Sequence, residues 1–523
     1  MKEPSVVIVG AGIGGLAAAL RLAAEGVRVT VVEAAAGPGG KMRTVPTVAG
    51  PADAGPTVLT LRPVFAELFA AAGEAIGDHL QLIPLEVLAR HYWSDGTVLD
   101  LHADHEASAA EVGTVFGPQA EAEFRAFHGR AARLLAAFDG PMMQAAEPSQ
   151  GELALRVARE PRLILDMAPW ATLGAMLGRS FSEPRLAQLF GRYATYVGGA
   201  PDASPALLAL IAAVEMRGVW AVEGGMHALA RAVEALARAR GASFRYGEAV
   251  LRIEMQGGRV AGVQTAGGRI AADAVLFNGD PRAIAAGMLG EGVRRAVTRA
   301  AVEPRSLSAF VHAFAAVPRG VDLAYHTVFF GDDPRAEFAA LREGRRPRDA
   351  TLYLCAQDRA LAGTVGTLAG TGAAERFEII LNGPPAGARA ETETEIAECQ
   401  TQVFNRLGTF GLSFSPRPQS ESLTTPEGFA RLFPGSSGSL YGLSPQGLMA
   451  GLRRPRARTA VAGLYLCGGG AHPGAGVPMA TLSARHAAGA ILSDLGLRST
   501  SRRTAMRGGM STGSATGVTG RSA

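Results

Sequence analysis

Lysine and cysteine are scarce in this chain. Its 523 residues include only two lysines, Lys2 and Lys41, and three cysteines, Cys355, Cys399 and Cys467. The cysteines lie far apart and show no paired spacing, so the sequence predicts neither a disulfide framework nor a zinc site. We expect a chain that works in a reducing compartment and carries no metal.

Clustered basic charge and long apolar runs are missing as well. The formal net charge is +4, and before the C-terminal tail no basic residues interleave with aromatic ones along one face. This argues against a nucleic-acid partner. The longest apolar run, residues 206–214, is much shorter than the roughly 20 residues of a membrane-spanning helix. A peripheral contact with a bilayer stays open.

Several catalytic signatures have no counterpart in the chain. It contains no Ser-His-Asp set, no H-E-x-x-H, no P-loop and no C-x-x-C motif. Hydrolase, metalloenzyme and kinase functions therefore lack support from the sequence.

The residues that are present favour an α/β enzyme of more than one domain. The chain is long for one compact core, and 48% hydrophobic residues with 67 glycines suit a tightly turned α/β protein. Residues 5–9, 16–24 and 27–32 are predicted to form strand, helix and strand. Further nucleotide-domain elements are predicted as a helix at 226–240, strands at 243–246, 251–254, 260–265, 274–277 and 463–467, and a helix from about 481 to 495.

The segments between these elements have different patterns. Charged, alanine-rich helical patterns at 121–138 and 185–196 predict an inserted helical region. Strand-like runs at 308–315, 350–355 and 376–382, followed by a helical pattern at 391–407, predict a second sheet that roofs the cofactor.

A glycine-rich turn follows the first strand. Residues 10–15 fit G-x-G-x-x-G, in which Gly10 permits the tight turn, Gly12 admits a pyrophosphate and Gly15 lets helix and strand pack closely. Glu33, at the end of the second strand, can accept hydrogen bonds from ribose hydroxyls. The alternative is a surface turn with a coincidental glutamate. The combination predicts a dinucleotide site.

The segment after Glu33 distinguishes a flavin from a nicotinamide. Residues 37–43 contain Gly-Gly followed by Lys41, and many flavoproteins pass such a basic segment along the flavin; the alternative is a solvated loop lysine. Pro56, Thr57 and Val58 then form a segment with few obstructing side chains, suited to lie against a bound ring or to form a plain turn.

Later segments add two candidates and a second glycine-rich motif. Val250 is a candidate adenine contact or a core valine, and Asn278 is a candidate ligand at a strand end or an Asx-turn residue. Residues 464–479 run from a strand through three glycines into a Pro-Gly-x-Gly-x-Pro turn and a helix. The N-terminus of that helix can stabilise negative charge on a reduced flavin. His472 there is either a general base or a backbone hydrogen-bond partner, so no catalytic residue is assigned.

These motifs resemble the bacterial phytoene-desaturase family. The likeness runs from about residue 5 to 495 and rests on GAGIGG, Glu33, PGGKMRT, ADAGPTVLT, FGRYATYVGG (190–199) and LYLCGGGAHPGAGVPMA. Segments at 45–47, 90–101 and 351–359 are most similar to the family's 1-hydroxycarotenoid 3,4-desaturases.

The resemblance implies a reaction and its partners. It implies FAD-dependent formation of the C3–C4 double bond of an acyclic 1-hydroxy- or 1-methoxycarotenoid in spheroidene- or spirilloxanthin-type biosynthesis, with oxygen or a quinone as electron acceptor. Because carotenoids reside in bilayers, it also implies a cytoplasmic protein bound peripherally to the inner or intracytoplasmic membrane, with residues 169–177 as the candidate contact or, alternatively, a buried helix. Other readings are a phytoene desaturase acting on earlier intermediates, a flavin amine oxidase, or a carotenoid-binding protein.

The resemblance carries specific residues over to the cofactor site. Tyr441 is expected to line the flavin face on the substrate side. The FAD contacts implied are Gly10, Gly12, Gly15, Glu33, Lys41, Pro56, Thr57, Val58, Val250, Asn278, Gly469, Gly476 and Val477.

The expected fold is α/β, with a Rossmann-like FAD-binding domain, an interleaved substrate domain built on a mixed sheet, and a helical membrane or tunnel insert. The FAD-binding parts are expected at 1–104, 221–300 and 455–497, the helical insert at 105–220, the substrate domain at 301–454 and a disordered tail at 498–523.

Overall fold

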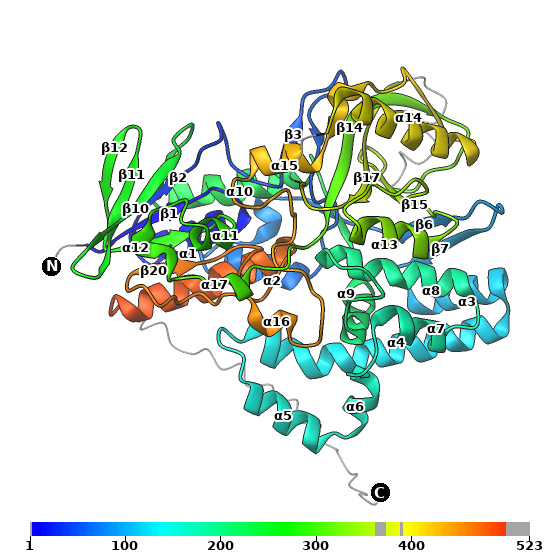
Figure 1. Ribbon diagram of the computed structural model, residues 1–523, viewed down its shortest axis with the longest axis horizontal. Helices are drawn as coiled ribbons and strands as arrows, with labels where there is room; N and C mark the ends of the chain where they lie inside the picture. The colour runs from blue at the N-terminus through cyan, green and yellow to red at the C-terminus, as the bar shows by residue number, and fades with distance from the viewer. Residues whose placement is uncertain (1–2, 361–372, 388–390, 498–523) are drawn as a thin grey trace, which may run out of the picture.

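The computed structural model describes residues 3–360, 373–387 and 391–497. The tail expected at 498–523 lies outside the described residues. Two large sheets, a smaller three-stranded sheet, two short two-stranded sheets and a group of helices make up the described part of the molecule (Figure 1).

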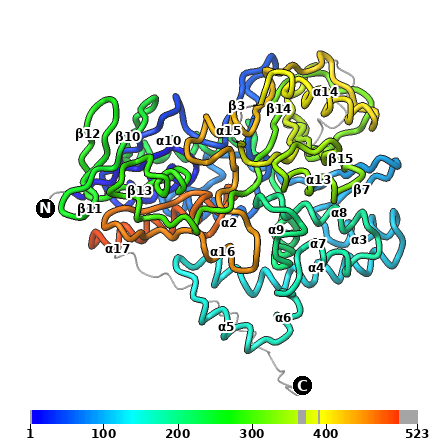
Figure 2. The backbone as a smooth tube through the Cα atoms, viewed as in Figure 1, coloured from blue at the N-terminus to red at the C-terminus, as the bar shows by residue number. Residues whose placement is uncertain are grey.

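A five-stranded parallel sheet forms the half of the molecule for which the sequence predicts a nucleotide site. Its order is β20-β13-β1-β2-β9, so segments from the start, middle and end of the chain lie side by side (Figure 2). The carboxyl ends of the central strands therefore share one edge, where open α/β sheets bind ligands. The strands are β1 (Ser5–Val9), β2 (Arg28–Val32), β9 (Ser243–Arg245), β13 (Ala274–Phe277) and β20 (Leu464–Leu466).

Both faces of this sheet are covered. Helix α1 (Ile13–Ala24) lies against α10 (Met226–Ala239) and α17 (Val477–Asp494), and its small buried alanines let the three helices pack closely. An antiparallel sheet of β10 (Val250–Gln256), β11 (Arg259–Thr265) and β12 (Gly268–Ala271) shares the core on the other face. The outcome is a three-layer arrangement.

The last helix begins earlier than its pattern predicts. It was expected from about residue 481, but α17 starts at Val477, directly after Gly476 at φ +105°. Pro478 occupies the first turn, where proline is tolerated because its missing N–H would have no helical partner. Pro478, which the sequence pattern placed in the turn, therefore belongs to α17.

The second sheet has eight strands and is mixed. Its order is β18-β14-β17-β16-β15-β6-β7, with β19 beside β14 and a parallel pairing of β15 with β6. Helix α14 (Glu393–Thr409) packs on one face. The strands are β6 (Val87–Tyr92), β7 (Val98–His102), β14 (Ser308–Arg319), β15 (His326–Phe329), β16 (Leu352–Ala356), β17 (Glu375–Gly383), β18 (Ser413–Ser415) and β19 (Leu423–Thr424).

Strands β6 and β7 differ from the expected division of the chain. The range 1–104 was assigned to the FAD-binding part, yet these strands extend the second sheet. Leu88, Leu99 and Leu101 are buried in the core beneath the helices. That burial, with a partner strand more than 200 residues away, fixes their place.

Helices fill most of the chain from 105 to 215. The pattern expected at 185–196 is divided in the structure, because α8 ends at Gly191 and a 3-10 turn, Arg192–Val197, leads to Gly198 at φ +76°. No helix among the described residues is long and apolar enough to cross a membrane. These helices are α3 (His105–Phe116), α4 (Pro118–Phe138), α5 (Gln150–Arg159), α6 (Arg162–Met167), α7 (Leu173–Ser180), α8 (Pro184–Gly191) and α9 (Leu210–Glu215).

Short elements connect these parts. They are β3 (Thr44–Val45) with β4 (Ala52–Asp53), β5 (Leu82–Pro84) with β8 (Trp220–Val222), and the helices α2 (Arg62–Ala70), α11 (Pro281–Ala285), α12 (Glu291–Arg294), α13 (Pro334–Arg342), α15 (Pro426–Leu432) and α16 (Ala450–Arg453).

Candidate functional site

One cavity of about 1800 Å³ joins the nucleotide-binding edge to the helices. Residues predicted for the site come from segments far apart in the chain, and the fold brings them to this cavity. Those that line it are Gly10, Gly12, Glu33, Lys41, Pro56, Thr57, Val58, Val250, Asn278, Tyr441, Gly469, Gly476 and Val477.

Gly15 is the predicted site residue that does not line the cavity. A Cβ atom there would lie 2.1 Å from the Gly10 carbonyl oxygen, a distance that side-chain atoms do not tolerate. Gly15 therefore lets the first turn of α1 pack against the end of β1, the packing role expected for the third glycine of the motif.

Asn278 organises the glycine turn from the end of β13. Its side-chain amide donates to the Gly10 carbonyl oxygen at 3.1 Å. A Cβ on Gly14 would lie 2.5 Å from the Asn278 Oδ1 atom, so the amide fills the space that this glycine leaves. The residue fixes the turn while lining the cavity.

Glu33 joins the end of β2 to the same turn. Its carboxylate accepts hydrogen bonds from the Ala11 amide at 2.6 Å and the Ala35 amide at 2.8 Å. A carboxylate has about four acceptor positions, so Glu33 retains capacity for ribose hydroxyls. The geometry suits both a turn-fixing and a ribose-binding role.

The glycine turn at residues 10–15 and the glycine segment at residues 37–40 lie against each other. Gly12 forms a bridge with Gly39, and a Cβ on Gly40 would be 3.0 Å from the Gly12 Cα. Backbone without side chains therefore faces the cavity at the N-terminus of α1, where a diphosphate is stabilised by amides and the helix dipole. This cradle fits a dinucleotide such as FAD.

Lys41 is a partly buried cation beside the loop that carries Tyr441. Its ammonium donates to the Leu440 carbonyl oxygen at 2.5 Å and lies 5.6 Å from the centre of the Phe433 ring. Burial lowers the Lys41 pKa to about 8, although nearby Asp280 favours the charged form.

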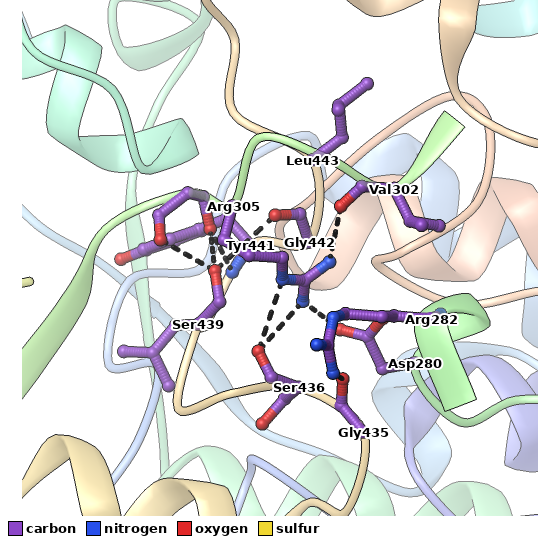
Figure 3. Close-up of polar contacts among 12 residues, drawn as sticks. Asp280, Arg282, Val302, Arg305, Gly435, Ser436, Ser439, Tyr441, Gly442 and Leu443 are labelled. Atoms are coloured by element: carbon purple, nitrogen blue, oxygen red, sulfur yellow. Dashed lines mark hydrogen bonds and ion pairs between the residues drawn. The ribbon is translucent and has the colours of Figure 1, made fainter. Parts of the chain in front are cut away.

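A buried ion pair holds the loop that leads to Tyr441. The Arg305 guanidinium pairs with Asp280, and both side chains are less than one-tenth exposed. Arg305 also donates to the carbonyl oxygens of Ser436 and Val302 (Figure 3). Loop, strand end and α11 are thereby fixed together.

Arg454 fixes the same loop from the C-terminal side. It donates to the carbonyl oxygens of Tyr441, Leu443 and Gly469 at 2.8, 3.0 and 2.9 Å. Burial lowers the Arg454 pKa to about 10, and burial raises the Tyr441 pKa to about 12. Tyr441 is thus a neutral phenol on a rigid loop at the cavity wall.

A hydrogen-bonded chain of side chains at the cavity was missed by sequence reasoning. The Thr57 hydroxyl lies 2.6 Å from the Tyr353 hydroxyl, which lies 2.7 Å from His326 Nδ1. Burial lowers the His326 pKa to about 3, so its imidazole is neutral. Tyr353 lies in one of the family-like segments, but only the alignment of β15 with β16 brings it to His326.

His472 contacts backbone and not the cavity. Its Nε2 donates to the Ala145 carbonyl oxygen at 2.8 Å. Among the residues that line the cavity are its neighbours from Pro473 onward, but not His472 itself. The structure thus supports the backbone-bonding alternative over a general base.

Comparison with known proteins identifies the family. Residues 13–492 match the model of the flavin containing amine oxidoreductases. The chain belongs to this family. Its cofactor is FAD, and the enzyme is an oxidoreductase.

Within the family, this oxidoreductase belongs with the carotenoid desaturases. It is 54% identical to a hydroxyneurosporene desaturase of Cereibacter sphaeroides, covering 95% of this chain and 99% of that one. It is 49% identical to a hydroxyneurosporene desaturase of Rhodobacter capsulatus, covering 94% and 98%. The resemblance seen in the sequence motifs is confirmed.

A solved structure of the same fold is putrescine oxidase bound to putrescine. It has a TM-score of 0.58 at 15% identity, with 94% of this chain and 99% of that chain covered. At this identity the likeness shows the fold alone, and it confirms the predicted α/β class.

Proposed function

We propose that this flavin-dependent desaturase forms the C3–C4 double bond of an acyclic 1-hydroxy- or 1-methoxycarotenoid in spheroidene- or spirilloxanthin-type biosynthesis. The observation that carries the proposal is the large cavity that joins the glycine cradle to walls of apolar side chains. Ala175, Ala187, Ile211 and Val214 contribute from α7, α8 and α9. A polyene needs such a long apolar enclosure. Relatives named hydroxyneurosporene desaturase support the substrate class.

The predicted cofactor contacts belong to this proposal. Gly10, Gly12, Glu33, Asn278 and the C-terminal glycines would hold the dinucleotide, with Gly15 fixing the helix behind it. The C-terminal glycines are Gly469 and Gly476, and the remaining proposed contacts are Lys41, Pro56, Thr57, Val58, Val250 and Val477, with Tyr441 on the substrate side.

Positioning is the main contribution that these residues make to the reaction. Bound FAD would supply a hydride acceptor, so that one saturated carbon would give up a hydride, its neighbour a proton, and the electron pair of that second C–H bond would form the double bond. The apolar walls exclude water and hold one carbon–carbon bond in place. Oxygen or a membrane quinone is the proposed electron acceptor.

A bilayer is the proposed source of the substrate. Of the segment 169–177, Trp170 is exposed, whereas Leu173, Met176 and Leu177 are buried. Further exposed apolar side chains lie just before it, Leu155 on α5 and Ile164 and Leu165 on α6. We therefore assign the membrane contact to α5, α6 and Trp170, on the cytoplasmic side of the inner or intracytoplasmic membrane.

The proposal is tested with purified protein, FAD and liposomes that contain a 1-hydroxycarotenoid. A longer conjugated system shifts the polyene absorption to longer wavelength, and chromatography of the product identifies the new bond. A control without FAD should show no shift. An unchanged spectrum with the complete mixture would contradict the proposal, and reduction of the flavin by a simple amine would favour an amine oxidase.

A further inference from the structure

A polar group interrupts the apolar wall of the cavity. Arg192, Tyr196 and Glu215 line it, at the 3-10 turn after α8 and at the end of α9. Arg192 and Tyr196 belong to the segment 190–199, one of the motifs that carry the family resemblance, and Glu215 contacts this segment. Glu215 accepts a hydrogen bond from the buried Tyr193 hydroxyl at 2.5 Å.

The three side chains act on one another. The Arg192 guanidinium lies 5.6 Å from the centre of the Tyr196 ring. Burial raises the Glu215 pKa, and Arg192 with the two tyrosine hydroxyls counteracts that rise. Within the described part of the chain, no carboxylate lies within 4.0 Å of the Arg192 guanidinium. The Arg192 guanidinium therefore keeps N–H groups at the cavity wall that can donate to a ligand.

A small second cavity of about 20 Å³ adjoins the same group. Arg192, Tyr196 and Glu215 line both cavities, and His326 lines the smaller one. The His326 Nε2 atom is buried and has no hydrogen-bond partner among the described residues. A space of this size and polarity holds about one water molecule. An oxygen-containing ligand would thus find polar partners here, beside an otherwise apolar enclosure.

The polar group adjoins the proposed flavin contacts and not a remote end of the cavity. Val58, in the segment that we propose lies against the flavin, also lines both cavities. Gly198, just after the 3-10 turn, lies against Tyr441, since a Cβ there would be 2.6 Å from the Tyr441 ring. The cluster therefore lies between two segments of the flavin site.

This location matches the chemistry of the proposed substrate, on which the inference rests. One carbon separates C1, which bears the oxygen, from the C3–C4 bond that reacts. The oxygen must consequently lie close to the flavin whenever that bond does. We infer that Arg192, Tyr196 and Glu215 form the pocket that recognises the C1 oxygen and selects oxygenated carotenoids. The Arg192 guanidinium can donate to a hydroxyl or methoxy oxygen. The Tyr196 hydroxyl donates to Glu215 and so orients that carboxylate, which can accept from a substrate hydroxyl only.

The inference is tested by the ratio of kcat/KM for a 1-hydroxycarotenoid to that for its parent of equal polyene length without the hydroxyl, both in the same liposomes. The wild-type ratio should be well above one. Arg192→Met removes the cationic donor, and Tyr196→Phe removes a hydroxyl with little change of shape. Each should lower the ratio roughly 10- to 100-fold, because the loss of one buried hydrogen-bond partner falls in that range.

Arg231→Met is the matched control, since Arg231 is exposed on α10 and lies outside both cavities. It should keep the wild-type ratio. FAD content and the thermal midpoint of each variant identify any that fails to fold. If Arg192→Met does not fold, the substrate ratio of the milder Tyr196→Phe variant decides whether the pocket is assigned correctly. If the wild-type enzyme converts both carotenoids equally, or the variants keep its ratio, the pocket is assigned wrongly while the desaturase function stands. If the wild-type enzyme converts neither, the proposed function is wrong and the inference falls with it.

Discussion

Lys41 is a residue of the proposed cofactor site whose side chain changes its protonation close to neutral pH. Its pKa is lowered by burial to about 8, so in the free protein the ammonium loses its proton as pH rises through that value. If Lys41 contacts the anionic cofactor as we propose, FAD affinity should fall as pH rises above about 8, by at most roughly tenfold per pH unit. Fluorescence titration of apoprotein with FAD measures this dependence.

The same residue predicts an opposite trend for stability. Between pH 8 and the ordinary lysine pKa of 10.5, the unfolded chain binds a proton at this lysine that the folded apoprotein does not. The Lys41 contribution to the free energy of unfolding should therefore become more favourable with rising pH. Lys41→Met should remove both trends, and Lys41→Arg should keep high FAD affinity through pH 9. If the affinity of the wild-type protein for FAD does not change with pH, the proposed contact between Lys41 and FAD is wrong.

Gly12 and Gly15 should fail in different ways when replaced by alanine. At Gly12 the nearest atom to a new Cβ is the Asn278 amide at 3.2 Å, whereas at Gly15 it is a backbone oxygen at 2.1 Å. Gly12→Ala should therefore weaken FAD binding with little loss of apoprotein stability. Gly15→Ala should lower the thermal midpoint even without FAD. Equal effects of both substitutions on apoprotein stability would contradict these separate roles.

At the level of elements, local signals identified the nucleotide-binding half. The strand predicted at 274–277 and the helix predicted at 226–240 match β13 and α10 within one residue, because apolar runs and glycine turns mark their ends. Most residues predicted to contact the cofactor line the cavity, and several of them, such as Glu33 and Asn278, directly follow the end of a strand. The joining of β6 and β7 to the second sheet could not be predicted, since it depends on a partner strand remote in sequence. Tyr353 and His326 meet only through the pairing of β15 with β16, and the helical packing brings the group around Arg192 to them.

The Arg305–Asp280 pair should be essential to the loop that carries Tyr441. Arg305→Met leaves the Asp280 carboxylate and the Ser436 carbonyl group without a buried cationic partner. Removing one member of such a pair costs about 3–5 kcal/mol, so we expect a large fall in denaturant resistance and loss of flavin. Arg299→Met is the control, because the Arg299 side chain in its pair with Glu303 is 87% exposed and water already solvates it. If Arg305→Met lowers denaturant resistance as little as Arg299→Met does, the Arg305–Asp280 pair is not what holds the loop that carries Tyr441.

At the scale of the whole molecule, α5 and α6 lie at an edge remote from both large sheets (Figure 1). Leu155, Leu165 and Trp170 are each exposed by half or more on this edge, although water disfavours large apolar side chains there. Nearby Arg156, Arg159 and Arg162 supply positive charge suited to anionic lipid headgroups. This combination is typical of an interfacial membrane contact.

Replacing Leu155 and Leu165 together by glutamate should therefore reduce binding to anionic liposomes. Each leucine that leaves the interface forfeits on the order of 1 kcal/mol, and each new carboxylate adds repulsion, so we expect the bound fraction in a flotation assay to fall by roughly 10-fold or more. Leu251→Glu is the control, since Leu251 is similarly exposed but lies on β10, which is on a different edge of the molecule from α5 and α6 (Figure 1). The double variant should still convert a detergent-dispersed carotenoid, because neither leucine lines the cavity. Unchanged flotation of the double variant would place the membrane contact on another face, whereas loss of conversion in detergent would show that α5 and α6 support the cavity itself.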